Sequence, residues 1–249
     1  MKYLMVLFAV VALNACRESR EPALSAEEVV NRAIEVAGGD RYRTSRIAFD
    51  FRGRHYVSYL EQGQRVLQRL TPTDSGMIED TRIGDTFRRR IGDSPVVLPD
   101  SMSRKFSNSV NSVHYFAYLP YGLNGEAVRK ELLGTVSIGG SQYYKIRVTF
   151  RPEGGGEDYQ DVFVYWFNTQ TFRPDYLAYE YQTDGGGIRF RQAYNDREVG
   201  GIRFADFRNL KPLEKVPVTS LDSLFGLGRL EELSVVELEH IQVSPGSYN

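Results

Sequence analysis

Cysteine and histidine, the side chains that build disulfides and most metal centres, are scarce in this sequence. The 249 residues include one cysteine and three histidines. One cysteine cannot form an intramolecular disulfide. His55, His114 and His240 stand far apart, in none of the HxH or HExxH patterns that indicate a zinc site. We therefore expect no metal site, and we interpret His114, which has aromatic neighbours, as a core or surface histidine.

The motifs of common enzyme classes are missing as well. The sequence contains no GxSxG nucleophile motif and no P-loop. Two glycine runs, 154–156 and 185–187, lack the strand-to-helix context of a phosphate-binding loop, so we assign them to a loop and a hairpin turn. Glu157, Asp158 and Asp161 lack the spacing of a calcium loop. We expect neither catalysis nor a cofactor.

No charge of one sign dominates the chain. With 31 basic and 32 acidic residues the formal net charge is −1, so no electrostatic field favours nucleic acid as a partner. Arginines nevertheless predict a basic stripe on one face of a sheet: Arg189, Arg191, Arg197, Arg203 and Arg208. The expected acidic partners are Asp184, Asp196, Glu198 and Asp206. We favour a solvated, charge-paired face, and a site for an anionic head group is the sharper alternative.

The apolar run near the amino terminus is too short to cross a bilayer. Leu4–Leu13 falls well below the roughly 20 residues of a transmembrane helix. It follows the basic Lys2 and leads into Leu13-Asn14-Ala15-Cys16, which resembles a bacterial lipobox. The only cysteine stands where this motif requires it. We therefore predict a lipoprotein signal peptide over residues 1–16 with Cys16 as the lipid attachment site; the alternative is an ordinary secretory signal with an unrelated cysteine.

Lipidation has consequences for location and partners. A lipoprotein cysteine carries several acyl chains, and two or more chains anchor a protein stably. Cys16 is then the membrane contact, and the polar residues 17–24 form a tether. Arg17 follows the cysteine in place of the aspartate that retains enteric lipoproteins in the inner membrane. This favours the outer membrane or the periplasmic face of the cell envelope.

Aromatic residues are abundant in the rest of the chain. The 16 tyrosines and 14 phenylalanines favour sheets over helices. Residues 161–207 predict four strands joined by tight turns. One face of the first strand, Asp161–Asn168, carries Val162, Val164 and Trp166, and the other face carries Phe163, Tyr165 and Phe167. Because side chains alternate along a strand, we expect both faces of this strand to be covered.

The remaining elements follow from local periodicity. We expect helices from a capping box at Ser25 and Glu28 to Gly38-Gly39, over Asp100–Tyr118, over Gly125–Leu133 and over Leu221–Leu227. The expected strands are Arg46–Tyr59, Arg65–Leu70, Gly76–Asp80, Asp85–Ile91, Thr135–Ile138, Gln142–Phe150, Arg173–Gln182, Ile188–Tyr194, Gly201–Phe207 and Glu231–Val243. We expect Asn195-Asp196 to be a turn. The chain is therefore mainly β (α+β), with a single β-rich domain over residues 25–243 and a tail over 244–249.

Several blocks carry a family resemblance: Ala37–Asp40, Phe49–Arg52, Ser107–Phe116, Leu119–Leu123, Asp161–Trp166 and Gly185–Arg191. Together they resemble a family of uncharacterised lipoproteins from Bacteroidota, a domain of unknown function that supplies no catalytic residue. Its members are similar in shape to the Lol-type periplasmic lipoprotein carriers. That resemblance implies a strongly curved antiparallel sheet, an incomplete β-barrel, with helices over its concave face and an apolar cavity.

The favoured function is a cell-envelope lipoprotein that holds a lipid or another apolar ligand in a half-barrel cavity. The expected cavity lining is Trp166, Tyr165, Val164, Phe116, Tyr115 and Phe190. An equally weighted alternative is that these side chains simply pack against one another. The second function is a non-catalytic envelope scaffold with a protein partner. The third and least favoured is a hydrolase that uses scattered carboxylates.

Overall fold

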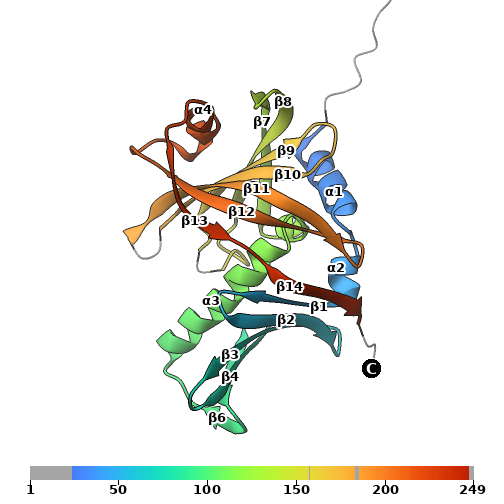
Figure 1. Ribbon diagram of the computed structural model, residues 1–249, viewed down its shortest axis with the longest axis vertical. Coiled ribbons are helices and arrows are strands. Elements are labelled where there is room, and N and C mark those ends of the chain that lie inside the picture. Colours follow the sequence, from blue (N-terminus) through green and yellow to red (C-terminus); the bar gives the residue numbers. More distant parts are fainter. Residues whose placement is uncertain (1–23, 157, 183–184, 247–249) are drawn as a thin grey trace, which may run out of the picture.

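A computed structural model describes residues 24–156, 158–182 and 185–246 (Figure 1). The expected signal peptide with Cys16, residues 17–23 of the expected tether and residues 247–249 of the expected tail lie outside the described residues. Glu157 and Asp184 also lie outside them.

The first of two sheets, sheet A, forms the lower half of Figure 1. It has seven antiparallel strands in the order β14-β1-β2-β3-β4-β5-β6. Their bounds are β1 Ser45–Phe51, β2 Arg54–Glu61, β3 Gln64–Thr73, β4 Gly76–Ile83, β5 Thr86–Ile91, β6 Ser94–Val96 and β14 Glu239–Pro245. Six of these strands follow one another along the chain, and only β14 arrives from the far end of the sequence.

Sheet B forms the upper half and also has seven antiparallel strands, in the order β13-β12-β11-β10-β9-β8-β7 (Figure 1). Their bounds are β7 Val128–Ile138, β8 Ser141–Phe150, β9 Val162–Asn168, β10 Pro174–Tyr181, β11 Gly187–Val199, β12 Ile202–Pro212 and β13 Leu230–Val236. The predicted four-strand meander is confirmed as β9 to β12. The fold is mainly β, as predicted, in two open sheets that do not close into a barrel.

The two sheets are joined where β13 of sheet B gives way to β14 of sheet A. Asp206 on β12 is 2% exposed and fixes this crossing. Its Oδ1 accepts the backbone N–H of Leu238 at 2.9 Å and a guanidinium N–H of Arg197 at 2.9 Å. Its Oδ2 accepts the Asn195 side-chain amide at 2.6 Å. One buried carboxylate therefore holds the last two strands in different sheets.

Helix α1, Ala26–Val36, lies against sheet B (Figure 1). The predicted capping box is present, because the Glu28 carboxylate accepts the Ser25 N–H at 2.8 Å and the Ser25 hydroxyl accepts the Glu28 N–H at 3.2 Å. After the helix, Gly38 has a φ of +131°, and a Cβ there would lie 2.8 Å from the Gly201 carbonyl oxygen. Only glycine allows this close approach to the β11–β12 turn.

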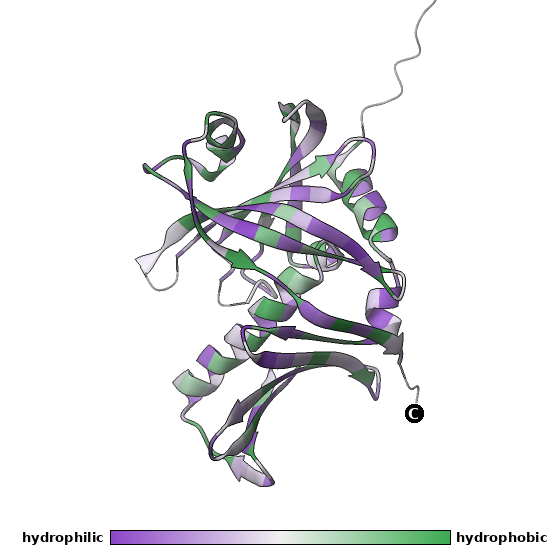
Figure 2. Cartoon of the chain, in the orientation of Figure 1, coloured by the Kyte–Doolittle hydropathy of each residue, from purple (hydrophilic) through white to green (hydrophobic). Residues whose placement is uncertain are grey.

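The other helices are α2 Arg41–Thr44, α3 Asp100–Ala117, α4 Leu221–Gly226 and the short 3-10 segments η1 Tyr121–Asn124 and η3 Val218–Ser220. The predictions of α3 and α4 are confirmed. In Figure 1, α3 runs beside β3 and β4 of sheet A, and its carboxyl end reaches sheet B. Figure 2 shows hydrophilic and hydrophobic residues interleaved along the strands of both sheets, as expected for sheets with two different faces.

Strand β9 is buried on both faces, as its sequence predicts. Tyr165 and Phe167 pack in one cluster with α1, whereas Val164 and Trp166 pack in another with α4. Tyr165 and Trp166 are both 0% exposed. A third cluster joins the two sheets and contains Phe49 of β1.

Two predicted elements are wrong because pairing partners far along the chain decide them. The expected helix Gly125–Leu133 is largely the first half of β7, which pairs with β8 from Val128↔Phe150 onward. The expected single strand Glu231–Val243 is two strands, since β13 pairs with β12 and β14 pairs with β1. Ser244 and Pro245, expected in the tail, pair with β1.

One turn was not predicted, and another was predicted at the wrong place. The expected strand Arg46–Tyr59 is the β1–β2 hairpin, which turns at Arg52 and Gly53 with φ values of 50° and 69°. The expected turn at Asn195-Asp196 is an irregularity inside β11, where Asn195 has a φ of 49° and the register shifts. The chain reverses at Gly200 and Gly201 instead. In both cases left-handed backbone fixes the position of the reversal.

A cavity between helix α3 and sheet B

Helix α3 is fixed to sheet A by buried polar contacts. Asp80 on β4 is 1% exposed, and its Oδ2 accepts N–H bonds from Arg69 at 2.6 Å and Arg89 at 2.9 Å. Arg69 also donates to the hydroxyl of Ser109 on α3 at 2.8 Å. The Arg89 guanidinium stacks 3.7 Å from the ring centroid of Phe106 on the same helix. The helix is therefore anchored around its middle, at Phe106 and Ser109.

His114 extends this attachment and has a structural role. It is 1% exposed, its Nε2 lies 3.1 Å from the Gln68 carbonyl oxygen, and its Nδ1 lies 3.1 Å from the Tyr118 hydroxyl. Burial lowers the pKa of His114 to about 4, so the imidazole is neutral at pH 7. Neither of these two partners is a carboxylate, and the contacts fit the core interpretation made from the sequence.

The carboxyl-terminal end of α3 contacts sheet B through aromatic rings. The hydroxyls of Tyr115 and Tyr165 lie 3.1 Å apart. The ring centroid of Phe116 lies 5.4 Å from that of Tyr179 on β10 and 6.3 Å from that of Phe163 on β9. The helix thus spans the space between the two sheets, and two cavities have Phe116 in their lining.

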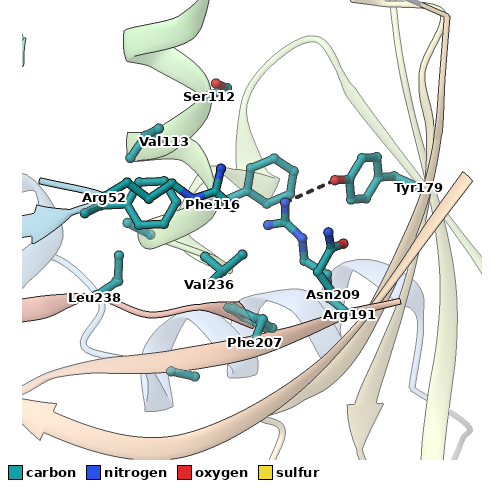
Figure 3. A pocket seen from close by; sticks show the side chains of 13 residues that line it. Arg52, Ser112, Val113, Phe116, Tyr179, Arg191, Phe207, Asn209, Val236 and Leu238 are labelled. Atoms are coloured by element: carbon teal, nitrogen blue, oxygen red, sulfur yellow. Dashed lines mark hydrogen bonds between the residues drawn. The ribbon is translucent and has the colours of Figure 1, made fainter. Parts of the chain in front are cut away.

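The smaller cavity, here called the arginine cavity, has a volume of about 350 Å³. Figure 3 shows its side chains, which come from the β1–β2 turn, α3, β10, β11, β12, β13 and the β13–β14 crossing. The polar lining residues are Arg52, Ser112, Tyr179, Arg191 and Asn209. The larger apolar ones are Phe51, Val113, Phe116, Phe207, Val236 and Leu238. Apolar walls with a few convergent polar groups are typical of ligand pockets.

The larger cavity, here called the tyrosine cavity, has a volume of about 990 Å³. Tyr115, Phe163 and Tyr181 contribute to its aromatic wall. It shares Ser112, Phe116 and Tyr179 with the arginine cavity, so the two are neighbours. Ligand pockets measure roughly 300–1,000 Å³, and the two volumes stand near the ends of that range.

Asp161 is an unusual carboxylate in the lining of the tyrosine cavity. Burial, and then the nearby charge of Asp158, raise the pKa of Asp161 to about 6. Its Oδ1 accepts the backbone N–H of Gln182 at 3.3 Å. This carboxyl group therefore changes charge in mildly acidic solution, inside the wall of a cavity.

The polar side of the arginine cavity centres on Arg191 of β11. Arg191 is 9% exposed, and burial lowers the pKa of its guanidinium. It donates to the Tyr179 hydroxyl at 3.1 Å, as Figure 3 shows, while its Nε has no hydrogen-bond partner among the described residues. Its guanidinium carbon lies 4.0 Å from the Phe116 ring centroid. The Oδ1 of Asn209 beside it also lacks a partner within the described chain.

The other arginines of the predicted stripe behave differently. Arg197 pairs with Asp206 at 2.9 Å, Arg203 with Asp196 at 2.5 Å, and Arg208 with Glu232 at 3.9 Å. Pairing with an expected acidic partner is thus confirmed for Arg197 and Arg203, whereas Arg208 pairs with Glu232, which was not expected. Arg203 is nevertheless only 7% exposed, so the stripe is not a uniformly solvated face.

The six residues expected to line one cavity fall into two groups. Tyr115 and Phe116 line the cavities described here, and Tyr165 lies buried next to Tyr115. Trp166, Val164 and Phe190 belong to the cluster on the opposite face of sheet B, where the Trp166 indole donates to Asp222 at 3.3 Å. They are absent from the lining of the arginine and tyrosine cavities. The cause is the period of two along a strand, which sends Tyr165 and Trp166 to opposite faces.

Sequence reasoning missed Arg52, Tyr179 and Asn209 as cavity residues. The alternation along β11 already placed Arg191 and Phe190 on opposite faces of the strand. Helix α3 covers the face that carries Arg191. Arg52 was hidden because the β1–β2 turn was not recognised. Tyr179 and Asn209 come from strands that meet Arg191 only in the folded sheet, Asn209 as its cross-strand partner.

Comparison with solved structures identifies two similar proteins. The structure is similar to that of the LolA-superfamily protein NE2245 from Nitrosomonas europaea, with a TM-score of 0.51 and 14% identity over 90% of this chain and 96% of that one. A DUF1329 family protein from Desulfovibrio piger ATCC 29098 is similar at a TM-score of 0.42 and 11% identity, over 90% and 95% of the two chains. The first of these likenesses assigns the fold to the LolA-like class.

Residues 29–238 match the family of unknown function DUF6503, so the chain belongs to that family. We found no significant match to the chain among curated proteins. Among the residues that the structure describes, no helix is both long and apolar enough to cross a membrane.

Proposed function

We propose that this protein is a cell-envelope lipoprotein that binds a lipid or another apolar ligand between α3 and sheet B. The observation that carries the proposal is the pair of neighbouring cavities that share Phe116, with volumes of about 350 and 990 Å³. Their walls combine aromatic rings with a few convergent polar groups, as ligand sites do. The role is binding rather than catalysis.

The LolA-like fold supports a carrier or binding role. Both sheets are open, and the carboxyl end of α3 reaches sheet B (Figure 1). Because Arg69 and His114 fix α3 to sheet A, the cavities lie between an anchored helix and a sheet surface. Such an arrangement keeps apolar surface available to a ligand instead of filling it with side chains.

The lipid anchor is part of the same proposal. Residues 1–16 are proposed to be a lipoprotein signal peptide with a lipobox, with Cys16 as the acylated residue, residues 17–24 as a tether and residues 25–243 as one domain. The protein would then be anchored at the outer membrane or on the periplasmic face of the cell envelope. Several acyl chains on one cysteine suffice for stable anchoring.

The test is a fluorescence titration of residues 17–249, which contain every described helix and strand, with the neutral probe N-phenyl-1-naphthylamine. We expect saturable binding with increased emission, and loss of binding in Phe116→Trp, because the larger ring fills the space between the two cavities. Trp166→Phe, on the opposite face of sheet B, is the matched control and should bind normally. Absence of saturable binding by the wild-type chain would contradict the proposal.

A scaffold role has one observation in its favour. Leu233 and Val235 on the edge strand β13 are 41% and 42% exposed. Apolar side chains on an edge strand can be covered by a protein partner. Photocrosslinking from position 235 in intact cells distinguishes the two functions, since a specific crosslinked protein together with an empty cavity favours the scaffold.

A further inference from the structure

Arg191 differs from the other buried arginines in having no acidic partner. Arg69 is 4% exposed and lies 2.6 Å from Asp80, and Arg203 is 7% exposed and lies 2.5 Å from Asp196. Arg191 is as well buried, yet among the described residues it forms no ion pair. Within the described part of the chain, its one hydrogen bond to another side chain goes to a neutral hydroxyl, that of Tyr179. A buried cation without a counter-ion is costly, and structures rarely keep one without a ligand.

A second guanidinium enters the same cavity. Arg52 lines this cavity from the β1–β2 turn. Its backbone φ is 50°, a value that few residues other than glycine adopt. Figure 3 shows its side chain crossing the cavity beside Phe116 toward Arg191. The positive charge of Arg52 acts on Arg191, and no lining residue of this cavity in the described chain is acidic. The cavity therefore has two cations and no anion.

Further polar groups complete the site. Tyr179 accepts the Arg191 N–H through its oxygen, so its own O–H remains available to donate into the cavity. Asn209 donates to Ser234 at 3.2 Å, which leaves its Oδ1 free to accept a ligand hydroxyl. Opposite these groups, Phe207, Val236 and Leu238 form an apolar wall. The arrangement separates a cationic end from an apolar one.

We propose that the arginine cavity binds a single-chain amphiphile with an oxyanion head group, a carboxylate or a phosphate monoester. Arg191, Arg52 and the Tyr179 hydroxyl hold the head group, and the apolar wall and the neighbouring tyrosine cavity take the chain. A guanidinium presents N–H donors in a planar fork that matches both head groups. This inference rests on the proposed function and names the class of ligand.

The experiment uses residues 17–249 with N-phenyl-1-naphthylamine bound, and three competitors with the same chain: dodecanoate, dodecyl phosphate and the neutral dodecan-1-ol. Isothermal calorimetry with each competitor provides a direct second readout. The variants are Arg191→Met, which keeps the length and loses the charge, and Arg191→Lys, which keeps the charge and loses the fork. Arg208→Met on β12 is the control, since Arg208 is exposed and pairs with Glu232.

In the wild-type chain we expect at least one anionic competitor to bind roughly ten- to a hundredfold more tightly than the alcohol, the ratio typical of a hydrogen bond to a charged group. Arg191→Met should abolish this preference without changing alcohol binding, Arg191→Lys should keep part of it, and Arg208→Met should keep all of it. The ratio of dodecanoate to dodecyl phosphate binding identifies the head group.

Equal binding of the alcohol and both anions to the wild type would overturn the head-group assignment while leaving the apolar cavity intact. An unchanged preference in a folded Arg191→Met variant would overturn it as well. If neither the probe nor any competitor binds the wild type, the proposed function fails, and this inference fails with it. The preference for anions over the alcohol is also measured on the wild type and on Arg191→Lys. The proposal can therefore still be tested if Arg191→Met does not fold.

Discussion

The guanidinium carbon of Arg191 lies 4.0 Å from the ring centroid of Phe116, so β11 and α3 share a buried cation–π contact. This contact forms part of the wall of the arginine cavity, next to the rings shared with the tyrosine cavity. The negative face of the Phe116 ring offsets part of the cost of burying the Arg191 charge, for which the described residues provide no carboxylate. The same contact joins the helix anchored on sheet A to the strand of sheet B that carries the unpaired charge.

Replacing Arg191 by methionine is expected to leave the stability of the ligand-free protein within about 1 kcal/mol of wild type, or to raise it. The loss of the cation–π contact is offset by removal of a buried cation, for which apolar replacements of similar volume are often neutral or stabilising. Urea denaturation measures the difference. The matched variant Arg69→Met should cost roughly 3 kcal/mol, because it breaks a buried ion pair with Asp80. Equal large losses in both variants would show that Arg191 has a structural role only.

Trp166→Ala is expected to destabilise the protein by about 3–5 kcal/mol, as truncation of a large core aromatic does. The side chain is 0% exposed and packs between β9 and α4 with Phe190. Loss of the indole N–H also removes a hydrogen-bond donor to Asp222. Thermal unfolding provides the measurement, and an unchanged midpoint would mean that Trp166 is not part of the core.

Stability should fall as the pH rises from about 4 to 6, through the contribution of Asp161. The unfolded carboxyl ionises near its ordinary pKa of about 3.9, whereas burial raises the folded pKa to about 6. Between these values the folded state binds the extra proton, so increasing pH disfavours folding. Asp161→Asn should remove this slope and melt higher than wild type at pH 7. The exposed Asp85→Asn serves as control and should retain the slope; a slope unchanged in Asp161→Asn would contradict the assignment.

Cys16→Ala in the full chain is expected to release the protein from membranes without unfolding it. The physical reason is that the acyl chains are the proposed anchor and that the described helices include no membrane-spanning one. Fractionation of cells followed by circular dichroism of the released protein measures both parts. Recovery of the variant in the membrane pellet would refute the lipoprotein proposal.

The sequence predicted the parts of the fold that local pattern decides. The period of two in 162–167 and the capping box at Ser25 indicate a two-faced strand and a helix start without reference to the rest of the chain. The helix predicted at Gly125–Leu133 is wrong. The prediction followed local propensity, since Glu126, Ala127, Leu132 and Leu133 are good helix formers, but pairing with β8 makes most of the segment a strand. The separation of β13 from β14 depends on Asp206, which is distant in sequence from Leu238.

The candidate site was predicted only in part for a related reason. Tyr115 and Phe116 could be recognised from their helical pattern, and Arg191 from its alternation with Phe190. What distinguishes Arg191 is the lack of an acidic partner among the described residues, and that depends on which strands and loops surround it. Asn209, Tyr179 and Arg52 come together with it only through sheet pairing and a turn at Arg52-Gly53.

The most direct test of the central claim is native mass spectrometry of residues 17–249, purified gently from an envelope extract. We expect a bound species whose mass corresponds to an anionic amphiphile, present on the wild type and on Arg208→Met and lost from Arg191→Met or Phe116→Trp. A ligand-free mass under every condition, with the protein folded, would contradict a ligand-binding function and would favour a scaffold that contacts a protein partner through β13.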